Sequence, residues 1–203
     1  MKRINITIIF LFISTLIYSQ NSVRKISDNR FIERKNSKDG VVDSLKNTII
    51  PFKYDFIDYK NERLIIRENK LNGLYSLDNK ELIPIKFQFI LPRKNNRFII
   101  WKENSIHGLS DNNGKIIIPL KYKSVSSIEN DDFYITENEK NLNGVYDFNG
   151  KNIIPEEYKF YTIDNYRIFA TKNNRPQIIN LMDSVNNIQL DEKIRLVETR
   201  RQY

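Results

Sequence analysis

Apolar and polar residues alternate in short runs along most of the chain, and polar turns separate these runs. In the run of residues 49–56, Ile50, Phe52, Tyr54 and Phe56 share one strand face, and the residues between them are proline or charged. A period of two residues is typical of a half-buried β-strand, whereas a helix would repeat its apolar positions every three to four residues. The chain is therefore predicted to be all-β.

This run recurs four times, each time around a proline and at a fixed distance from a glycine. A proline follows the glycine by eleven residues, and Tyr or Phe follows the proline by three. The four sets are Gly40, Pro51, Tyr54; Gly73, Pro84, Phe87; Gly108, Pro119, Tyr122; and Gly144, Pro155, Tyr158. Successive glycines are 33, 35 and 36 residues apart, which is the period of a structural repeat.

Each unit contains three strand-like pieces. The first begins at the glycine and ends in a polar turn, which is Asn-Gly at residues 113–114 and 149–150. The second carries the proline, and positions −1, +1, +3 and +5 around it are predicted to form a buried face. The third piece is short and apolar, and it often opens with arginine, as at Arg63 and Arg97.

The recurring glycine, proline and aromatic residues are interpreted as structural marks. Proline lacks an N–H group, so it is expected at a bulge, a strand start or an edge, where it bends the strand. Glycine allows a bulge, a positive φ or the close approach of another backbone. We therefore expect these marks to specify backbone geometry rather than ligand contacts.

The predicted architecture is a tandem series of antiparallel three-stranded β-meanders that forms a twisted, open-ended array. A closed, propeller-like ring is the alternative, because closure would remove the exposed edges. The expected segments are a flexible leader at 21–29; a repeat domain at 30–172 with units near 40–66, 73–101, 108–136 and 144–171; and a degenerate repeat or C-terminal cap at 173–203. For this last segment a short helix and a last strand pair are the two alternatives.

The first twenty residues have the pattern of a secretory signal peptide. Lys2 and Arg3 precede the largely apolar stretch 4–17, which is short for a membrane span. We therefore predict an exported protein, located in the periplasm, at the cell surface or outside the cell, with no stable transmembrane span after cleavage of residues 1–20. Anchoring by an uncleaved signal is the alternative.

Composition limits the chemistry that the chain can carry. Its 203 residues are 40% hydrophobic and 29% charged, include no cysteine, and give a formal net charge of +8. Disulfides and thiolate metal sites are therefore excluded, and His107, the sole histidine, excludes a multi-histidine metal site within one chain. No metal or cofactor is expected. The basic residues are spread out, and nucleic acid is not an expected partner outside the cytoplasm.

Few residues are candidates for a site. No catalytic set is predicted, because acids such as Asp111 and Asp147 fall at hairpin turns, where carboxylates bond their own backbone. The aromatic residues Tyr75, Tyr146 and Trp101 are the tentative binding residues. Tyr75 and Tyr146 occupy equivalent positions in two units, which also suits a packing role. Trp101 breaks the unit pattern and is the best single candidate for an anchor.

The pattern Gly-[Leu/Val]-x-[Asp/Ser], then Asn-Gly-Lys, then Ile-Ile-Pro-x-Lys-Tyr resembles the WG-repeat family of bacterial β-repeat proteins. The resemblance covers about residues 39–161, and it is best over Gly108–Tyr122 and Gly144–Tyr158. It implies tandem β units and often export, and it supplies no catalytic residues. The tryptophan of Trp-Gly is replaced, because the residues before the four glycines are Asp39, Asn72, His107 and Asn143.

The sequence thus favours a non-enzymatic, exported module that presents an extended surface to a protein or glycan of the cell envelope. An envelope scaffold or assembly subunit without a small ligand is the second hypothesis, and a glycan-acting hydrolase with two acids in one pocket is the third. The oligomeric state is left open.

Overall fold

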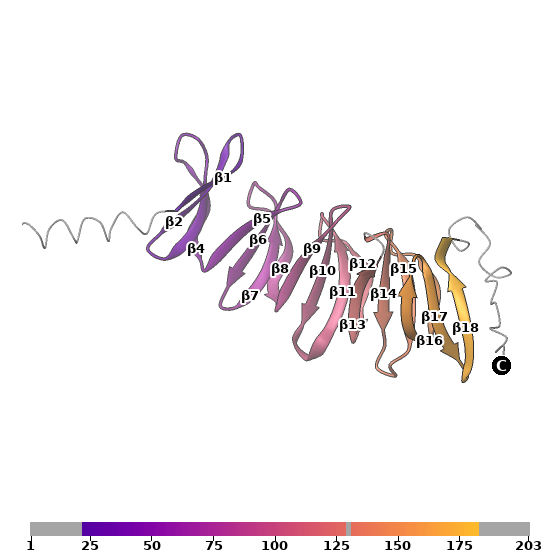
Figure 1. Cartoon of the computed structure of the whole chain (residues 1–203). Helices are drawn as coiled ribbons and strands as arrows, with labels where there is room; N and C mark the ends of the chain where they lie inside the picture. Colours follow the sequence, from indigo (N-terminus) through magenta and orange to yellow (C-terminus); the bar gives the residue numbers. More distant parts are fainter. Residues whose placement is uncertain (1–21, 129–130, 183–203) are drawn as a thin grey trace, which may run out of the picture. The chain divides into compact units, whose positions relative to one another are not determined.

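The computed structural model describes residues 22–128 and 131–182, and almost all of them lie in antiparallel strands joined by short turns (Figure 1). The all-β prediction is therefore confirmed. The chain divides into two compact units, with the boundary between Ile90 and Leu91, and each unit is described by itself. They are called unit 1 and unit 2 below.

The strands form four sheets in which sequence neighbours pair. The first sheet contains β1 (Val23–Ser27), β2 (Arg30–Lys35), β3 (Lys38–Val42) and β4 (Thr48–Tyr54), and the second contains β5 (Phe56–Lys60), β6 (Arg63–Glu68), β7 (Leu71–Tyr75) and β8 (Glu81–Phe87). The third contains β9 (Phe89–Arg93), β10 (Arg97–Lys102), β11 (Ile106–Asp111) and β12 (Ile116–Tyr122), with the short 3₁₀ turn η1 (Glu103–Ser105) after β10. The six-stranded sheet contains β13 (Ser124–Ile128), β14 (Phe133–Glu137), β15 (Asn143–Asp147), β16 (Asn152–Asp164), β17 (Arg167–Lys172) and β18 (Arg175–Asn180).

Each proline-bearing piece of the repeat serves two sheets. It closes one sheet as its last strand, breaks at the polar residue four positions after the proline, and opens the next sheet as its first strand. The breaks lie at Asp55, Gln88 and Lys123, while β16 runs through the same position and pairs first with β15 and then with β17. The predicted three-piece meander is therefore present, and sharing one piece gives four-stranded sheets.

The break changes which residues are buried. The sequence analysis placed position +5 on the core face, but Phe89 is 54% exposed and Phe56 is only half-buried. Position +6 is buried instead, at Ile57, Ile90 and Val125. The prediction is wrong at position +5 because the break residue is not paired in either sheet. The side chains that follow it therefore point to the opposite faces from those that simple alternation predicts.

The four glycines and prolines meet in one recurring bulge. In each of the four repeats, the residue before the glycine pairs with the aromatic residue at position +3, as His107 does with Tyr122. The residue after the glycine pairs with the residue before the proline, as Leu109 does with Ile118. Three residues of the proline strand therefore face a single glycine. A Cβ on Gly108 would lie 2.8 Å from the carbonyl oxygen of Ile118, and the other three glycines meet the equivalent oxygen at 2.7–2.9 Å.

Close approach, and not a positive φ, therefore requires these glycines. Of the glycines in the described residues, only Gly114 and Gly150 have a positive φ, and both lie in Asn-Gly turns. Proline fits the bulge because the ladder is interrupted there and its missing N–H is not needed.

Asparagine forms most of the remaining hairpin turns. Pairs such as Asn61–Glu62, Asn95–Asn96 and Asn173–Asn174 have positive φ at both residues, which is the geometry of a type I′ hairpin turn. Asparagine accepts this conformation more readily than most residues, which accounts for its abundance at these turns.

Each unit has its own buried core of aliphatic and aromatic side chains. In unit 1 the main cluster includes Ile50, Tyr54, Ile57, Leu64 and Ile66. In unit 2 one cluster forms around Leu109, Ile118, Tyr122, Tyr134 and Tyr146, and another around Val145, Ile154, Tyr158, Ile168 and Ile179. The aromatic residues at position +3, Tyr54, Phe87, Tyr122 and Tyr158, are all buried.

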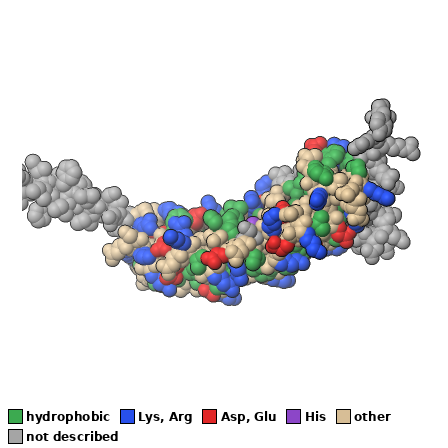
Figure 2. All heavy atoms as spheres, turned by 90° about the horizontal axis from the view of Figure 1, so that it is seen from below, with side chains coloured by type: hydrophobic (Ala, Val, Ile, Leu, Met, Phe, Trp, Pro, Cys, Tyr) green, Lys and Arg blue, Asp and Glu red, His purple; other side chains and the backbone are tan. Residues whose placement is uncertain are grey.

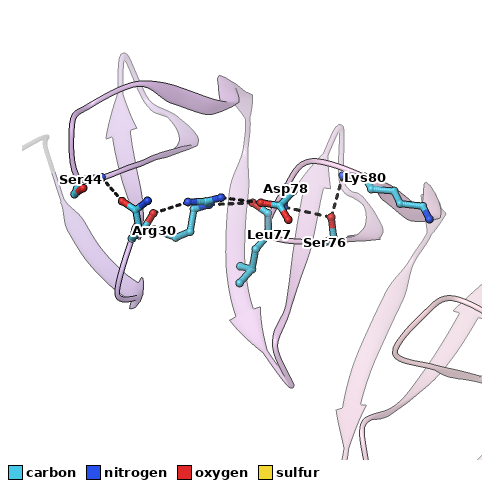
Figure 3. Close-up of polar contacts among 7 residues, drawn as sticks. Arg30, Ser44, Ser76, Leu77, Asp78 and Lys80 are labelled. Carbon is cyan, nitrogen blue, oxygen red and sulfur yellow. Dashed lines mark hydrogen bonds and ion pairs between the residues drawn. The ribbon is translucent and has the colours of Figure 1, made fainter.

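Arginine at the start of the third piece joins successive sheets. Arg30 of β2 donates to the carbonyl oxygen of Leu77 and to the carboxylate of Asp78, at 3.4 and 2.7 Å, beyond β7 in the next sheet (Figure 3). Arg97 of β10 donates to the carbonyl oxygen of Phe148 in the same manner, at 2.9 Å. The arginine that the sequence pattern marks thus acts as a clip between sheets.

The ends of the repeat domain differ from the predicted limits. Residues 23–27, assigned to a flexible leader, form β1 and pair with β2, because this strand takes the place that β5, β9 and β13 take in the later sheets. At the other end, residues 175–180 form β18, which lies within the predicted degenerate repeat at 173–203. The predicted signal peptide and the possible C-terminal helix lie outside the described residues.

Replacing Gly108 by alanine is predicted to destabilise the protein by about 1–3 kcal/mol, because the added methyl overpacks the bulge backbone. Urea unfolding, followed by the fluorescence of Trp101, measures this loss. Ser126→Ala, at an exposed strand position, is the control and should change the free energy of unfolding by less than about 0.5 kcal/mol. Equal stability of the two variants would contradict the close-approach explanation.

Candidate functional site

The residue before each repeat glycine, where the WG pattern has tryptophan, fixes the break in the proline-bearing piece. Asp39 accepts a hydrogen bond from the Ile57 amide at 2.9 Å, and Asn143 accepts one from the Phe160 amide at 3.0 Å. Asn72 instead donates to the Gln88 carbonyl oxygen at 2.7 Å. These polar side chains hold the backbone where the strand passes from one sheet to the next, and they position the concavities described below.

His107, the fourth member of this set, packs differently. Its ring lies edge-on to Trp101, its cross-strand neighbour, with 5.2 Å between ring centroids. Burial lowers the pKa of His107, so the neutral imidazole is favoured. The predicted anchor Trp101 is half-buried and packs against a core cluster of unit 2.

The structure places Tyr75 and Tyr146 in the interior, with exposed fractions of 8% and 7%. Each contacts the aromatic residue at position +3 of the preceding repeat: the ring centroids of Tyr54 and Tyr75 are 6.4 Å apart, and those of Tyr122 and Tyr146 are 6.0 Å apart. Protein atoms cover these rings, which are packed between repeats and are not presented to a ligand.

The acids at the hairpin turns bond their own backbone. Asp111 accepts from the amides of Asn113 and Lys115, and Asp147 accepts from the equivalent amides two and four residues on, all at 2.8–2.9 Å. Ser76 takes this place in the second repeat, as Figure 3 shows for its bond to the Lys80 amide. Asp78 is free of this role and pairs with Arg30 instead.

Unit 1 has a surface concavity of about 390 Å³ between two successive strand breaks. We call it the unit 1 concavity; its lining residues are Asp55, Arg67, Lys70, Asn72, Gln88 and Phe89. Asp55 and Gln88 are the break residues themselves, Arg67 lies on β6, and Lys70 lies in the turn between β6 and β7. Phe89, at the start of β9, presents an exposed aromatic ring.

The carboxylate of Asp55 is committed to its own surroundings. It accepts a hydrogen bond from Lys38 at 2.6 Å and one from the Asn69 amide at 2.8 Å. The bond from Lys38 is the main cause that lowers the pKa of Asp55, so the group is ionised and its charge is offset at neutral pH. The bond to Asn69 also fixes the turn that carries Lys70.

The two cations of the unit 1 concavity form no salt bridge among the described residues. Within the described part of the chain, no carboxylate lies within 4 Å of the charged groups of Arg67 or Lys70. Arg67 stacks its guanidinium over the ring of Phe56 at 5.2 Å, and Arg24 lies 5.6 Å from the same ring centroid. A cation–π contact of this kind restricts the guanidinium of Arg67, whose N–H groups form no salt bridge among the described residues.

The equivalent position of unit 2 has the opposite arrangement. Lys123 replaces Asp55, and Glu137 replaces Arg67. The backbone contact is the same in both units: the Lys123 amide donates to the Glu137 carbonyl oxygen at 2.8 Å, and the Asp55 amide donates to the Arg67 carbonyl oxygen at 2.9 Å. There Lys123 pairs with Glu137 at 3.0 Å and with Asn141 at 2.5 Å. Lys123 and Glu137 of unit 2 therefore neutralise each other, whereas Arg67 of unit 1 forms no salt bridge among the described residues.

Unit 2 has a different concavity of about 320 Å³, whose lining includes Lys121, Lys140, Glu139, Tyr122 and Glu156. Glu156 occupies position +1, where the other repeats have apolar residues. One of its carboxylate oxygens accepts from Tyr122 at 2.6 Å, from Asn152 at 3.2 Å and from Thr136 at 3.4 Å. We interpret Glu156 as the acceptor that satisfies the buried hydroxyl of Tyr122.

In the described ranges, no group of three or more acidic or histidine side chains is placed to hold a metal ion. No helix within those ranges is long and apolar enough to cross a membrane. Basic side chains on the face seen in Figure 2 are interspersed with acidic and hydrophobic ones instead of forming one block.

Sequence reasoning did not identify Arg67, Lys70 or Phe89. The polar residue four positions after every repeat proline gives no distinct signal, because a simple alternating strand also places a polar residue there. That Arg67 forms no salt bridge among the described residues depends on three-dimensional pairing and leaves no mark in the sequence.

Two segments of the chain match a known family of repeats. Residues 40–71 and 108–141 match the family described as WG containing repeat. The second match includes the Gly108 stretch that carried the resemblance. No curated protein matches the chain.

Three solved structures give weak matches at low identity. Hsv2 of Kluyveromyces lactis is 11% identical over 86% of this chain and 67% of its own, with a TM-score of 0.39. The N-terminal domain of Nup159 is 13% identical over 80% of this chain and 58% of its own, with a TM-score of 0.38. The WD40 β-propeller domain of Doa1 is 13% identical over 80% of this chain and 64% of its own, with a TM-score of 0.31. The chain thus spans at most about two thirds of the length of these three.

Two buried tyrosines provide a matched test of the hydrogen bonds behind the unit 2 concavity. Tyr122 donates to Glu156 and shares a 2.6 Å bond with Tyr146, whereas the buried hydroxyl of Tyr134 has no hydrogen-bond partner among the described residues. Burial raises the pKa of Tyr134 to about 12 and that of Tyr122 further.

Tyr122→Phe should therefore lower the free energy of unfolding by about 1–3 kcal/mol, because Glu156 loses its main donor. Tyr134→Phe should be neutral or stabilising, because it removes a polar group that makes no bond. Urea unfolding of both variants checks the difference, and equal losses would contradict the assigned network.

Proposed function

We propose that this chain, in which residues 40–71 and 108–141 are WG containing repeats, is an exported, non-enzymatic module that binds a protein or glycan of the cell envelope. The unit 1 concavity is its proposed binding site. One observation carries the proposal: Arg67 and Lys70 line the same concavity as the exposed ring of Phe89 and form no salt bridge among the described residues. Such a combination of cations, amides and an aromatic face suits recognition of a polar ligand.

The remaining features of the chain support binding over catalysis. The residues before the repeat glycines, the turn acids and the hydroxyls of Tyr75 and Tyr122 have structural partners, which accounts for them without a reaction. The unit 2 concavity does contain two acids, Glu139 and Glu156, which is the feature that a hydrolase would need. Because one oxygen of Glu156 accepts three hydrogen bonds, we assign this residue to structure.

Export rests on the N-terminal sequence. Lys2 and Arg3 followed by the apolar stretch 4–17 have the charge and length of a signal peptide. A chain without cysteine also needs no oxidative folding after export, since its sheets are held by packing, strand pairing and the arginine clips.

An assembly role is the second candidate, favoured by one observation. β18 pairs with β17 alone among the described strands, so one edge of the six-stranded sheet has no partner in the described ranges. Unpaired edges are sites for strand addition. Light scattering of the purified full chain distinguishes this role, because concentration-dependent self-association would favour it.

The export proposal predicts that the full-length chain, expressed in a bacterium with a periplasm, is recovered outside the cytoplasm without residues 1–20. Intact-mass measurement of the exported protein checks the cleavage. Recovery of the chain with its N-terminus intact in the membrane fraction would favour the uncleaved anchor, and retention in the cytoplasm would contradict export.

The binding proposal predicts that the purified chain cosediments with envelope fragments and that Phe89→Ala or Arg67→Gln reduces the bound fraction at least about tenfold. Loss of a charge-assisted hydrogen bond or a stacking face is worth roughly 1.5–3 kcal/mol. Phe148→Ala and Lys115→Gln, which alter exposed residues of unit 2, are the controls. Equal sedimentation of all five proteins would contradict the assigned site.

A further inference from the structure

We infer that the unit 1 concavity binds an acidic polysaccharide, with a uronate carboxylate on Arg67 and the sugar ring on Phe89. This inference deepens the proposed function and rests on it, because it names the ligand class of the same site. Three features carry it: an oriented arginine, a fixed second cation and an exposed aromatic face with amides beside it.

Arg67 is prepared to bind a planar carboxylate. Its guanidinium lies 5.2 Å from the ring centroid of Phe56, and no acid of the described residues occupies its donor groups. Guanidinium and carboxylate groups match as two parallel hydrogen bonds, and an arginine that is already held in place loses less conformational freedom on binding. A lysine or a freely moving arginine would give less selectivity for this shape.

Lys70 is a second cation whose backbone position is fixed. It lies at φ 68° in the turn between β6 and β7, and the neighbouring amide of Asn69 is bonded to the Asp55 carboxylate. The Asp55 charge is offset by Lys38. The unit 1 concavity therefore has a net positive character, which attracts an anionic ligand.

Phe89 and the amides favour a sugar over a simple anion. The ring of Phe89 is 54% exposed, although it sits where the repeat pattern would bury it. One face of a pyranose ring is lined by C–H groups and packs on aromatic rings, while its hydroxyls need donors and acceptors of the kind that the side-chain amide of Gln88 supplies. The volume of about 390 Å³ is within the range of small-ligand sites.

Within the described residues, the equivalent position of unit 2 does not repeat the open arrangement. At the equivalent position of unit 2, Lys123 is bonded to Glu137 and Asn141, and Phe160 packs against Tyr158 with 6.5 Å between the ring centroids. Because the Lys123–Glu137 ion pair occupies this position in unit 2, we expect each chain to bind one ligand.

The test is calorimetric titration of the purified full chain with trigalacturonate, with galactotriose as the uncharged probe and inorganic phosphate as the charge-only probe. We expect one site per chain for trigalacturonate, binding at least about tenfold weaker for galactotriose, and weakening by added salt. Arg67→Gln, Lys70→Gln and Phe89→Ala should each weaken trigalacturonate binding, whereas the matched variants Lys115→Gln and Phe148→Ala should not.

Thermal melting of each variant verifies folding, and Lys70→Gln is the variant least connected to packing. Binding of phosphate as tight as that of trigalacturonate would overturn the inference, because charge alone would then explain it. Binding that Lys115→Gln weakens as much as Arg67→Gln would also overturn it. If trigalacturonate does not bind but Phe89→Ala still loses envelope cosedimentation, the ligand class is wrong and the proposed function stands. If neither effect appears, both fail.

Discussion

The structure depends on a close backbone contact that recurs in every repeat. Opposite each repeat glycine, the proline strand bulges by two residues, and the carbonyl oxygen before the proline comes so near that no Cβ fits. Only glycine can stand under this bulge, and proline tolerates the interrupted ladder. The bulge in turn sets the aromatic residue at +3 into the core.

The consequences of the bulge extend to the surface. Four residues after the proline, the strand leaves one sheet and enters the next, and the side chain before the glycine bonds the backbone at this break. Concavities form between successive breaks because the turn that leads into the next glycine strand lies between them. The backbone of the unit 1 concavity is thus specified by the repeat, while its chemistry depends on which charged residues occupy the positions around the break.

Much of the fold could be predicted from the sequence, because its marks are local. The alternation of apolar residues and the spacing of Gly108, Pro119 and Tyr122 fix strand type, period and order. The reversal of burial after the break could not be predicted by alternation alone, since Phe56 and Phe89 continue the pattern and yet leave the core. The strand β1 was missed because it carries none of the marks.

The site was less predictable than the fold. Tyr75 and Tyr146 were chosen for their chemistry, but their equivalent positions already indicated packing, and they are buried. Arg67 and Glu137 occupy the same place in two repeats with opposite charge, and only the three-dimensional pairing shows that one is stacked on Phe56 and the other bonded to Lys123. Function in a repeat protein resides in such departures from the shared pattern.

The central claim is that the same backbone geometry forms a ligand-binding concavity in unit 1, whereas the ion pair of Lys123 and Glu137 occupies the equivalent position in unit 2. Amide hydrogen exchange of the full chain, with and without trigalacturonate, tests it most directly. The account predicts added protection in the segments 67–72 and 88–90, and no change in the equivalent segment 137–143. Equal protection of both segments, or protection confined to 137–143, would contradict it.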